Sequence, residues 1–264
     1  MNKKSRMTIW LLALFIFSAI CIFLLIVLNP SVKTKGQKNE KAGDIRKEGE
    51  NSVVIKTSKI AKHNEFTYEF WNQDELGDPE MSLKEDGSFD IKWTGIFNML
   101  ARIGIRPGLD NTIVSYNVED YTVTAGASYL CVYGWTYNEE TRDNLVEFYI
   151  VENWKNFRPP GDGGTLKGTV VVDGDEYDIY TSLRTEQPSI QGTATFYQYW
   201  SVRKEGTQRT KGQIDVAAHF NAWKKLGMKF GDTLYEVSFC IEGYEGNKNG
   251  NGSAKVTELH FETR

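Results

Sequence analysis

The chain has 264 residues, with 31 Lys+Arg against 35 Asp+Glu and a formal net charge of −4. A composition that is 40% hydrophobic and 25% charged excludes a fully disordered or collagen-like chain. The net negative charge argues against nucleic-acid binding, which needs a basic surface. Aromatic residues make up 13% of the chain and there are 24 glycines, a combination common in β proteins.

Residues 1–32 are predicted to be an export segment. Lys3, Lys4 and Arg6 precede residues 9–28, which are almost continuously apolar. That run has about the ~20 residues that span a bilayer and exceeds the roughly 7–15 of a signal-peptide core. No clear cleavage site follows it, so a signal peptide and an uncleaved signal-anchor helix both stay open. Either form places the rest of the chain outside the cell, secreted or anchored to the outer face of the membrane.

Residues 33–52 hold ten charged side chains and are predicted to be a flexible linker, because they cannot bury enough apolar surface to order themselves. Residues 1–52 contain nine Lys+Arg and four Asp+Glu, which leaves 22 against 31 for the rest. Residues 53–264, the predicted catalytic domain, therefore carry −9 (22 minus 31). An acidic domain suits a neutral or basic ligand better than a polyanion.

From Phe66 onward, short runs of alternating apolar and polar residues recur between turn signals, which indicates β-strands. An Asp-Gly pair within residues 172–175 predicts a hairpin turn. The domain is therefore predicted to be all-β, a two-sheet sandwich or jelly roll with one helix.

One segment breaks the strand pattern and is predicted to be that helix. Val216, Phe220 and Trp223 fall at helical spacing, Asp215 can cap the start and Gly227 can end it.

Three predicted strands, residues 129–135, 145–153 and 194–202, divide in the same way. One face of each is aliphatic, and the other combines aromatic with polar side chains. The second face carries Tyr129, Cys131, Tyr133, Trp135, Glu147, Tyr149, Phe196, Gln198 and Trp200. This division predicts a sheet with a core on one side and a carbohydrate groove on the other, since aromatic rings stack on the C–H faces of sugars. The alternative is that these aromatics only fill the core or the surface.

Two carboxylates stand inside apolar strands, Glu147 in LVEFYIV and Glu242 in VSFCIEGY. A buried glutamate needs a partner or a task. Two of them facing one another would have their pKa values driven apart, as glycoside hydrolysis requires. A structural Glu–Arg pair, with Arg184 as the partner, is an equally weighted alternative on strand parity alone.

Several long motifs resemble one family in the right order. LVEFYIVENWKNFRPPG (145–161) is similar to the nucleophile strand of the glycoside hydrolase family 11 xylanases, and IEGYEGNKNGNGSA (241–254) to their acid/base strand. YEFWNQ, SYLCVYGW, YDIYTSLRTEQPSIQGTATFYQYWSVR and HFNAWKKLGM also match. The resemblance runs from about Tyr68 to Phe261 and implies a β-jelly roll of two curved antiparallel sheets with one helix, preceded here by the N-terminal hydrophobic segment.

The resemblance also implies an endo-1,4-β-xylanase that cleaves xylan with retention. Glu147 matches the nucleophile and Glu242 the general acid/base. Asn98 falls where a residue hydrogen-bonds the acid/base. The other matching substrate-binding positions are Trp71, Tyr129, Tyr133, Tyr149, Arg184, Gln198, Trp200 and Pro188, the last at the tip (188–190) of a "thumb" hairpin over the cleft.

Two departures stand out. Phe148 follows the nucleophile where Tyr is more usual, and strand parity directs it to the aliphatic face. Tyr235 would be a second stacking residue of the distal subsite, but it lies seven residues before Glu242. That odd spacing puts the two on opposite faces unless a β-bulge intervenes.

The predicted partner is xylan, acted on by a monomer without cofactor or metal, with membrane anchoring through residues 9–28 as an option. The rival function is a non-catalytic xylan-binding module tethered at the cell surface, which could dispense with either glutamate. A serine or cysteine hydrolase has little support, because Gly-x-Ser-x-Gly is absent and Cys131 and Cys240 lie in strands as small packing residues.

Overall fold

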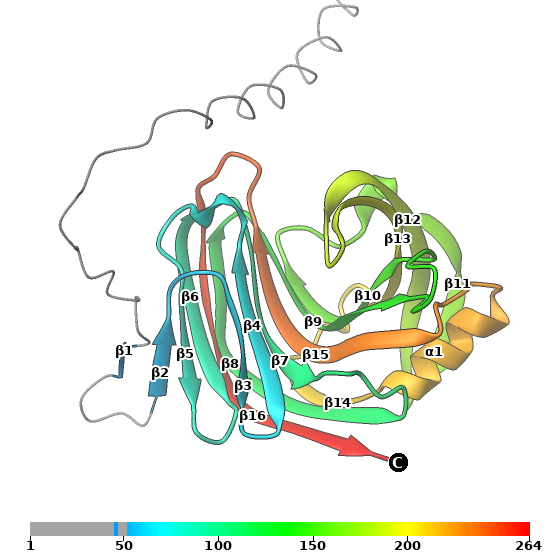
Figure 1. Cartoon of the computed structure of the whole chain (residues 1–264), viewed down its shortest axis with the longest axis horizontal. Coiled ribbons are helices and arrows are strands. Elements are labelled where there is room, and N and C mark those ends of the chain that lie inside the picture. Colours follow the sequence, from blue (N-terminus) through cyan, green and yellow to red (C-terminus); the bar gives the residue numbers. More distant parts are fainter. Residues whose placement is uncertain (1–44, 47–51) are drawn as a thin grey trace, which may run out of the picture. The chain divides into compact units, whose positions relative to one another are not determined.

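The computed structural model describes residues 45–46 and 52–264, which form two β-sheets and one α-helix (Figure 1). The predicted export segment (1–32) and most of the charged segment 33–52 lie outside the described residues. Within the described part of the chain, no helix is long and apolar enough to cross a membrane. Ile45–Arg46 pairs with Val53 and Val54, which places a two-residue strand within the segment 33–52 that is predicted to be a flexible linker.

The smaller sheet, sheet A, has seven strands. In spatial order they are β1 (Ile45–Arg46), β2 (Ser52–Ile55), β5 (Glu80–Lys84), β6 (Phe89–Ile96), β16 (Gly250–Thr263), β8 (Thr112–Ala125) and β14 (Lys211–Asp215).

Sheet B has nine strands and carries the candidate site. Their spatial order is β11 (Thr165–Val172), β12 (Asp175–Ser189), β13 (Gly192–Arg203), β10 (Val146–Lys155), β9 (Ala127–Tyr137), β15 (Thr233–Tyr244), β7 (Asn98–Ile105), β4 (Phe66–Asn72) and β3 (Lys59–His63). Two 3-10 turns, η1 (Gln73–Glu75) and η2 (Gly161–Gly163), complete the elements.

The two sheets enclose the main hydrophobic core, which confirms the predicted sandwich. Aliphatic residues of β9 and β10, such as Val132 and Phe148, belong to this core. Tyr116 of sheet A stacks on Phe239 of sheet B with ring centroids 5.0 Å apart. The aromatic residues at alternate positions of the same strands form a second cluster on the opposite face of sheet B. The alternation therefore separates a core face from a site face, as the sequence pattern indicates.

Helix α1 (Val216–Lys225) forms where the sequence predicts it. Asp215 caps its first turn by accepting a hydrogen bond from the Ala218 amide at 3.0 Å. Its apolar side packs into the main core, where Phe220 meets Phe148 edge-on at 5.0 Å. Phe148 thus points to the core face, as its strand parity predicts.

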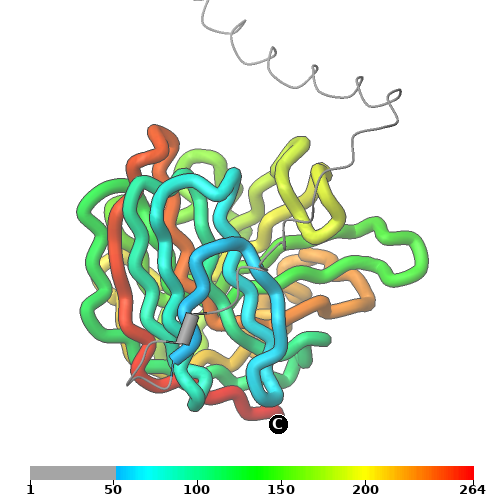
Figure 2. The backbone as a smooth tube through the Cα atoms, turned by 60° about the vertical axis from the view of Figure 1, so that its left-hand side comes forward, coloured from blue at the N-terminus to red at the C-terminus, as the bar shows by residue number. Residues whose placement is uncertain are grey.

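The expectation of purely antiparallel sheets was wrong for one pair of strands, because β10 and β13 run parallel. After β10 the chain crosses to the sheet edge and returns as the antiparallel meander β11–β12–β13. The two outer strands of this meander, β11 and β13, both run in the direction of β10, and β13 pairs with β10 in parallel. The hairpin turn between β12 and β13 is the yellow-green loop near the top of Figure 2. The parallel register sets Gln198 beside Glu147.

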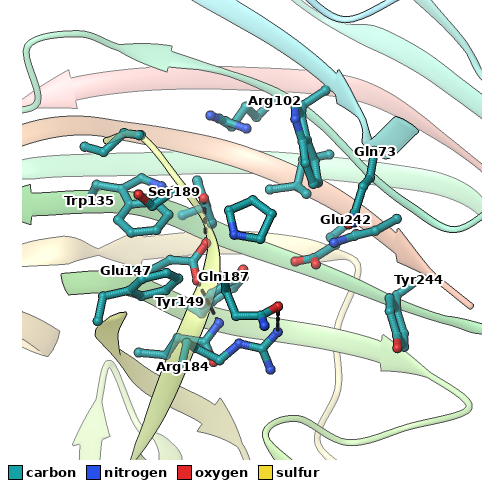
Figure 3. Close-up of a pocket in the computed structure, with 18 of the residues that line it drawn as sticks. Gln73, Arg102, Trp135, Glu147, Tyr149, Arg184, Gln187, Ser189, Glu242 and Tyr244 are labelled. Atoms are coloured by element: carbon teal, nitrogen blue, oxygen red, sulfur yellow. Dashed lines mark hydrogen bonds between the residues drawn. The ribbon is translucent and has the colours of Figure 1, made fainter. Parts of the chain in front are cut away.

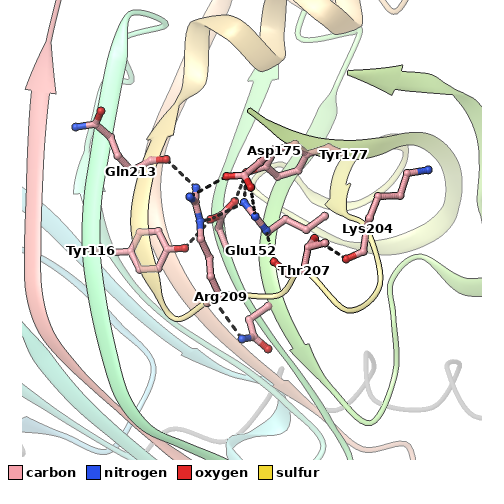
Figure 4. Close-up of polar contacts among 10 residues, drawn as sticks. Tyr116, Glu152, Asp175, Tyr177, Lys204, Thr207, Arg209 and Gln213 are labelled. Carbon is pink, nitrogen blue, oxygen red and sulfur yellow. Dashed lines mark hydrogen bonds and ion pairs between the residues drawn. The ribbon is translucent and has the colours of Figure 1, made fainter. Parts of the chain in front are cut away.

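A buried ion cluster on the core side joins Glu152 of β10 to residues of neighbouring segments (Figure 4). The same strand carries Glu147. Glu152 is fully buried there and accepts hydrogen bonds from the hydroxyls of Tyr116 and Tyr177, each at 2.6 Å. Arg203 lies 3.7 Å from the same carboxylate, and Arg209 forms a close ion pair with it. A carboxylate with this many partners is well compensated for its lost hydration.

Replacing Glu152 by alanine is expected to lower the free energy of unfolding by about 3–5 kcal/mol, because two arginines and two phenols lose their shared acceptor. Urea unfolding followed by tryptophan fluorescence measures the change. Lys211→Ala is the control: it breaks an exposed 3.4 Å pair with Glu258 and should change stability by less than about 1 kcal/mol. Equal effects of the two substitutions would show that the buried cluster adds no net stability.

Candidate active site

A cleft of about 340 Å³ opens on the site face of sheet B (Figure 3). Both candidate catalytic carboxylates, Glu147 and Glu242, line it. It also brings together most of the residues predicted to bind substrate: Trp71, Asn98, Tyr133, Tyr149, Arg184, Pro188 and Gln198. These seven residues come from six strands of sheet B, so the cleft exists only in the folded sheet.

Glu147 on β10 is buried and held by two hydrogen bonds. The Tyr133 hydroxyl donates to Oε1 at 2.7 Å, and the Gln198 amide donates to Oε2 at 2.7 Å. Burial raises the pKa of Glu147, while the hydrogen bonds from Gln198, Tyr133 and Tyr149 oppose that rise. Donors to both oxygens stabilise the ionised form, so Glu147 is suited to act as a carboxylate.

The orientation of Gln198 is fixed by a chain of hydrogen bonds behind it. The Ser182 hydroxyl donates to the Gln198 amide oxygen at 3.1 Å, which turns the amide nitrogen toward Glu147. The indole nitrogen of Trp200 in turn donates to Ser182 at 2.9 Å. Sequence reasoning missed Ser182, because its position opposite Gln198 appears only once β12 and β13 are paired in register.

Two predicted substrate residues lie behind the cleft wall instead of lining it. Trp200 is stacked on Tyr149 with centroids 4.1 Å apart and planes inclined by 10°, so Tyr149 covers it. Tyr129 meets Trp200 edge-on at 6.3 Å and is also largely buried. Both support the cleft surface that Tyr149 presents.

Glu242 on β15 faces the same cleft from the other side of β9. Its Oε2 is buried without a hydrogen-bond partner among the described residues. Burial, followed by the negative charge of Glu147, raises the pKa of Glu242 to about 8. Glu242 is therefore protonated at neutral pH.

The two carboxyl groups are thus different acids in one cleft. Glu147 is hydrogen-bonded as a carboxylate, whereas the buried Glu242 retains its proton. One group can attack an electrophilic carbon while the other protonates a leaving oxygen. This is the division of roles that hydrolysis of a glycosidic bond by a glutamate pair requires.

Comparisons with known proteins show the family of the chain. The family model described as "Glycosyl hydrolases family 11" matches residues 63–257. The chain belongs to glycosyl hydrolase family 11.

Named relatives and solved structures of the family are similar to much of the chain. The bifunctional endo-1,4-beta-xylanase XylA of Ruminococcus flavefaciens is 45% identical over 208 residues, covering 73% of this chain but 21% of that protein. Endo-1,4-beta-xylanase A of Bacillus pumilus is 40% identical over 75% of this chain and 83% of its own length. The structure of the family 11 xylanase from Neocallimastix patriciarum superposes with a TM-score of 0.70 at 33% identity, over 81% of this chain and all of that one.

The chain thus spans less than a third of several of the relatives it matches, including 29% of an endo-1,4-beta-xylanase A from Thermoclostridium stercorarium.

Asn98, which the family resemblance places beside the acid/base, lines the cleft on β7. It pairs in register with Tyr244, while Glu242 pairs with Leu100. Asn98 Oδ1 and Glu242 Oε2 are both buried without a hydrogen-bond partner among the described residues. The hydrogen bond expected between the two side chains therefore stays a prediction.

The β12–β13 hairpin, which the family resemblance implies is a thumb, contributes Arg184, Pro188 and Ile190 to the cleft. Arg184 is solvent-exposed, and its guanidinium donates to Gln187 at 3.4 Å. Its positive charge acts to lower the pKa of both Glu147 and Glu242. Arg184 is thus an electrostatic neighbour of the two carboxyl groups, and no direct ion pair joins it to either within the described structure.

The odd spacing of Tyr235 is resolved by a β-bulge. The register of β15 on β9 shifts between Leu234 and Glu236, so Tyr235 is the extra residue. Tyr235 packs against the aromatic cluster on the site face, whereas Leu234 packs against the main core. Tyr235 does not line the cleft itself, which leaves Trp71 as the cleft-lining member of the expected stacking pair.

Sequence reasoning missed the charged residues of the cleft wall on β4 and β7. Glu69 lines the cleft two residues before Trp71, and Arg102 lines it four residues after Asn98. Period-2 spacing from the two recognised residues places both on the site face, which is the signal that could have found them.

Proposed function

We propose that the chain is an endo-1,4-β-xylanase that hydrolyses internal β-1,4-xylosidic bonds of xylan with retention of configuration. Membership of family 11 and the xylanases among its relatives support this proposal. The observation that carries it is the pairing in one cleft of a carboxylate held by two hydrogen bonds and a carboxyl group that burial keeps protonated.

In the first step, Glu147 attacks the anomeric carbon and forms a glycosyl ester as the bond to the leaving oxygen breaks. Glu242 gives its proton to that oxygen, so the departing sugar leaves as a neutral alcohol. In the second step, Glu242 takes a proton from water while the water oxygen attacks the anomeric carbon. Glu147 leaves as a carboxylate and Glu242 is protonated again, which restores the starting state.

The cleft wall supplies groups suited to a neutral sugar. Trp71 offers a flat apolar ring, and Tyr133, Tyr149 and Gln198 surround the nucleophile with polar atoms. Xylose lacks the hydroxymethyl group of glucose, so a narrow cleft can reject glucose polymers by steric exclusion. The chain is proposed to act as a monomer without a cofactor.

We further propose that the domain works outside the cell, secreted or held at the membrane through residues 9–28. Xylan is a polymer that does not cross a membrane, so an enzyme that cleaves it must meet it outside. The basic residues before the apolar run support this orientation.

The test is incubation of the full chain with xylan and, separately, with carboxymethyl cellulose, followed by measurement of reducing sugar. Release from xylan alone is expected. NMR of the first product should show the β-anomer before mutarotation, since two displacements retain configuration. Xylan that binds but is not cleaved would instead favour a non-catalytic xylan-binding module.

A further inference from the structure

Two arginines and two glutamates form a buried ion cluster beside the nucleophile, and the catalytic steps above do not use them. Arg102 of β7 lies 2.8 Å from Glu69 of β4 and 3.2 Å from Glu236 of β15. Arg106 contacts the same two carboxylates at 2.7 and 2.9 Å. Arg102 and Glu236 are almost inaccessible, with side-chain exposures of 4% and 2%. The four charges cancel, so the cluster adds no net charge to the cleft. Each guanidinium contacts both carboxylates, which restricts its movement.

Only one of the two arginines reaches the catalytic groups. The guanidinium carbon of Arg102 lies 4.9 Å from the centre of the Tyr133 ring, within cation–π range. Arg106 instead covers the ring of Tyr235 at 4.3 Å, outside the cleft lining. Figure 3 shows Arg102 at the edge of the cleft that holds Glu147 and Glu242.

The hydroxyl of Tyr133 makes two hydrogen bonds. It donates to Glu147 Oε1 at 2.7 Å and accepts from the Trp135 indole at 2.6 Å. A small rotation of the ring would break the bond to the nucleophile. A flat cation fixed against one side of the ring resists that rotation and also favours a more polarised O–H group.

The charges around this phenol act in opposite directions. Burial and then Glu147 raise the pKa of Tyr133, Arg102 opposes them, and Glu236 adds a further rise. Arg102 also acts to lower the pKa of Glu242. In the pairing of β7 with β15, Arg102 lies opposite Cys240.

We propose that Arg102 is a positioning residue for the nucleophile: clamped by Glu69 and Glu236, it holds the Tyr133 ring so that the hydroxyl donates to Glu147. This inference rests on the proposed function, because it gives the cluster a task in the same cleft. Nothing in the reaction requires Arg102 to touch the sugar.

The test compares Arg102→Gln with Arg106→Gln, since each removes one positive charge from the same cluster. The pKa of Glu147 is followed by NMR titration of protein labelled with carbon-13 in the glutamate carboxyl groups, with Glu147→Gln to assign the signal. Arg102→Gln is expected to raise that pKa by about one unit and to move the acid limb of kcat/KM up by the same amount. Arg106→Gln should produce less than half of that shift. Equal shifts, or none in Arg102→Gln, would overturn the proposal.

A double-mutant cycle tests the path through Tyr133. In a Tyr133→Phe background the donor is gone, so adding Arg102→Gln should change the pKa of Glu147 little. An unchanged Arg102 effect in that background would refute the role of Tyr133. If Arg102→Gln does not fold, Glu69→Gln carries the test, because it keeps the charge of Arg102 but removes one side of its clamp. The proposal then expects Tyr133 to loosen and the pKa of Glu147 to rise, although a nearby negative charge is lost. A fall in that pKa contradicts the proposal.

The NMR titration needs no substrate, which separates the two conclusions. A wild-type protein that fails to cleave xylan would refute the proposed function. Even then, the expected rise in the pKa of Glu147 in the Arg102→Gln variant would support the link from Arg102 to Glu147.

Discussion

Replacing Glu147 by glutamine is expected to reduce xylan hydrolysis by at least about a thousandfold, because the amide cannot form the glycosyl ester. Glutamine has the same shape as glutamate, and Tyr133 can still donate to its carbonyl oxygen. The cleft should therefore keep its form, and the variant should still bind xylan. Reducing-sugar release measures the loss, and affinity electrophoresis in gels containing xylan measures the binding.

Glu258→Gln is the matched control for this experiment. Glu258 is a half-exposed carboxylate of β16 that pairs with Lys211 on the surface, and its replacement should leave activity unchanged. Circular dichroism of both variants checks that the fold is kept. A Glu147→Gln protein that retains more than about a tenth of wild-type activity would exclude Glu147 as the nucleophile.

The sequence predicts which side chains lie on the site face wherever they alternate between the two faces of a strand without a bulge. Tyr133 and Trp135 on β9, and Glu147 and Tyr149 on β10, lie on one face because the members of each pair are two positions apart along the strand. Phe148 falls on the core face for the same reason. Parity is a local property of one strand, so it can be determined without knowing the neighbouring strands.

Glu69 and Arg102 were missed although strand parity places them on the site face, but the other parts that escaped prediction depend on register, which joins residues distant in sequence. The bulge at Tyr235 is visible only when β15 is paired with β9. Ser182 and Gln198 are sixteen residues apart and meet only through the β12–β13 pairing. Glu236 and Arg102 are 134 residues apart and form their pair only after β7 and β15 align. Alternation within one strand carries no information on such alignments.

The pH dependence of the wild-type protein should carry the signatures of both glutamates. Glu242 must be protonated to act as an acid, so kcat/KM is expected to fall as the pH rises through about 8, the value of its pKa. Glu147 must be ionised, so kcat/KM should also fall as the pH drops through its own pKa, which burial places above the usual glutamate value. The profile is therefore a bell whose alkaline side belongs to Glu242.

Replacing Glu242 by glutamine is expected to remove that alkaline limb and to slow xylan hydrolysis by about 10²–10⁴-fold, because no proton reaches the leaving oxygen. A 2,4-dinitrophenyl xylobioside separates this role from a structural one. Its leaving group departs as a stable anion and needs no proton, so the first burst of dinitrophenolate should form nearly as fast as in the wild type. Without a base to activate water, the glycosyl ester on Glu147 should then accumulate and be visible as added mass. A burst slowed as much as xylan hydrolysis would mean that Glu242 shapes the cleft and does not donate the proton.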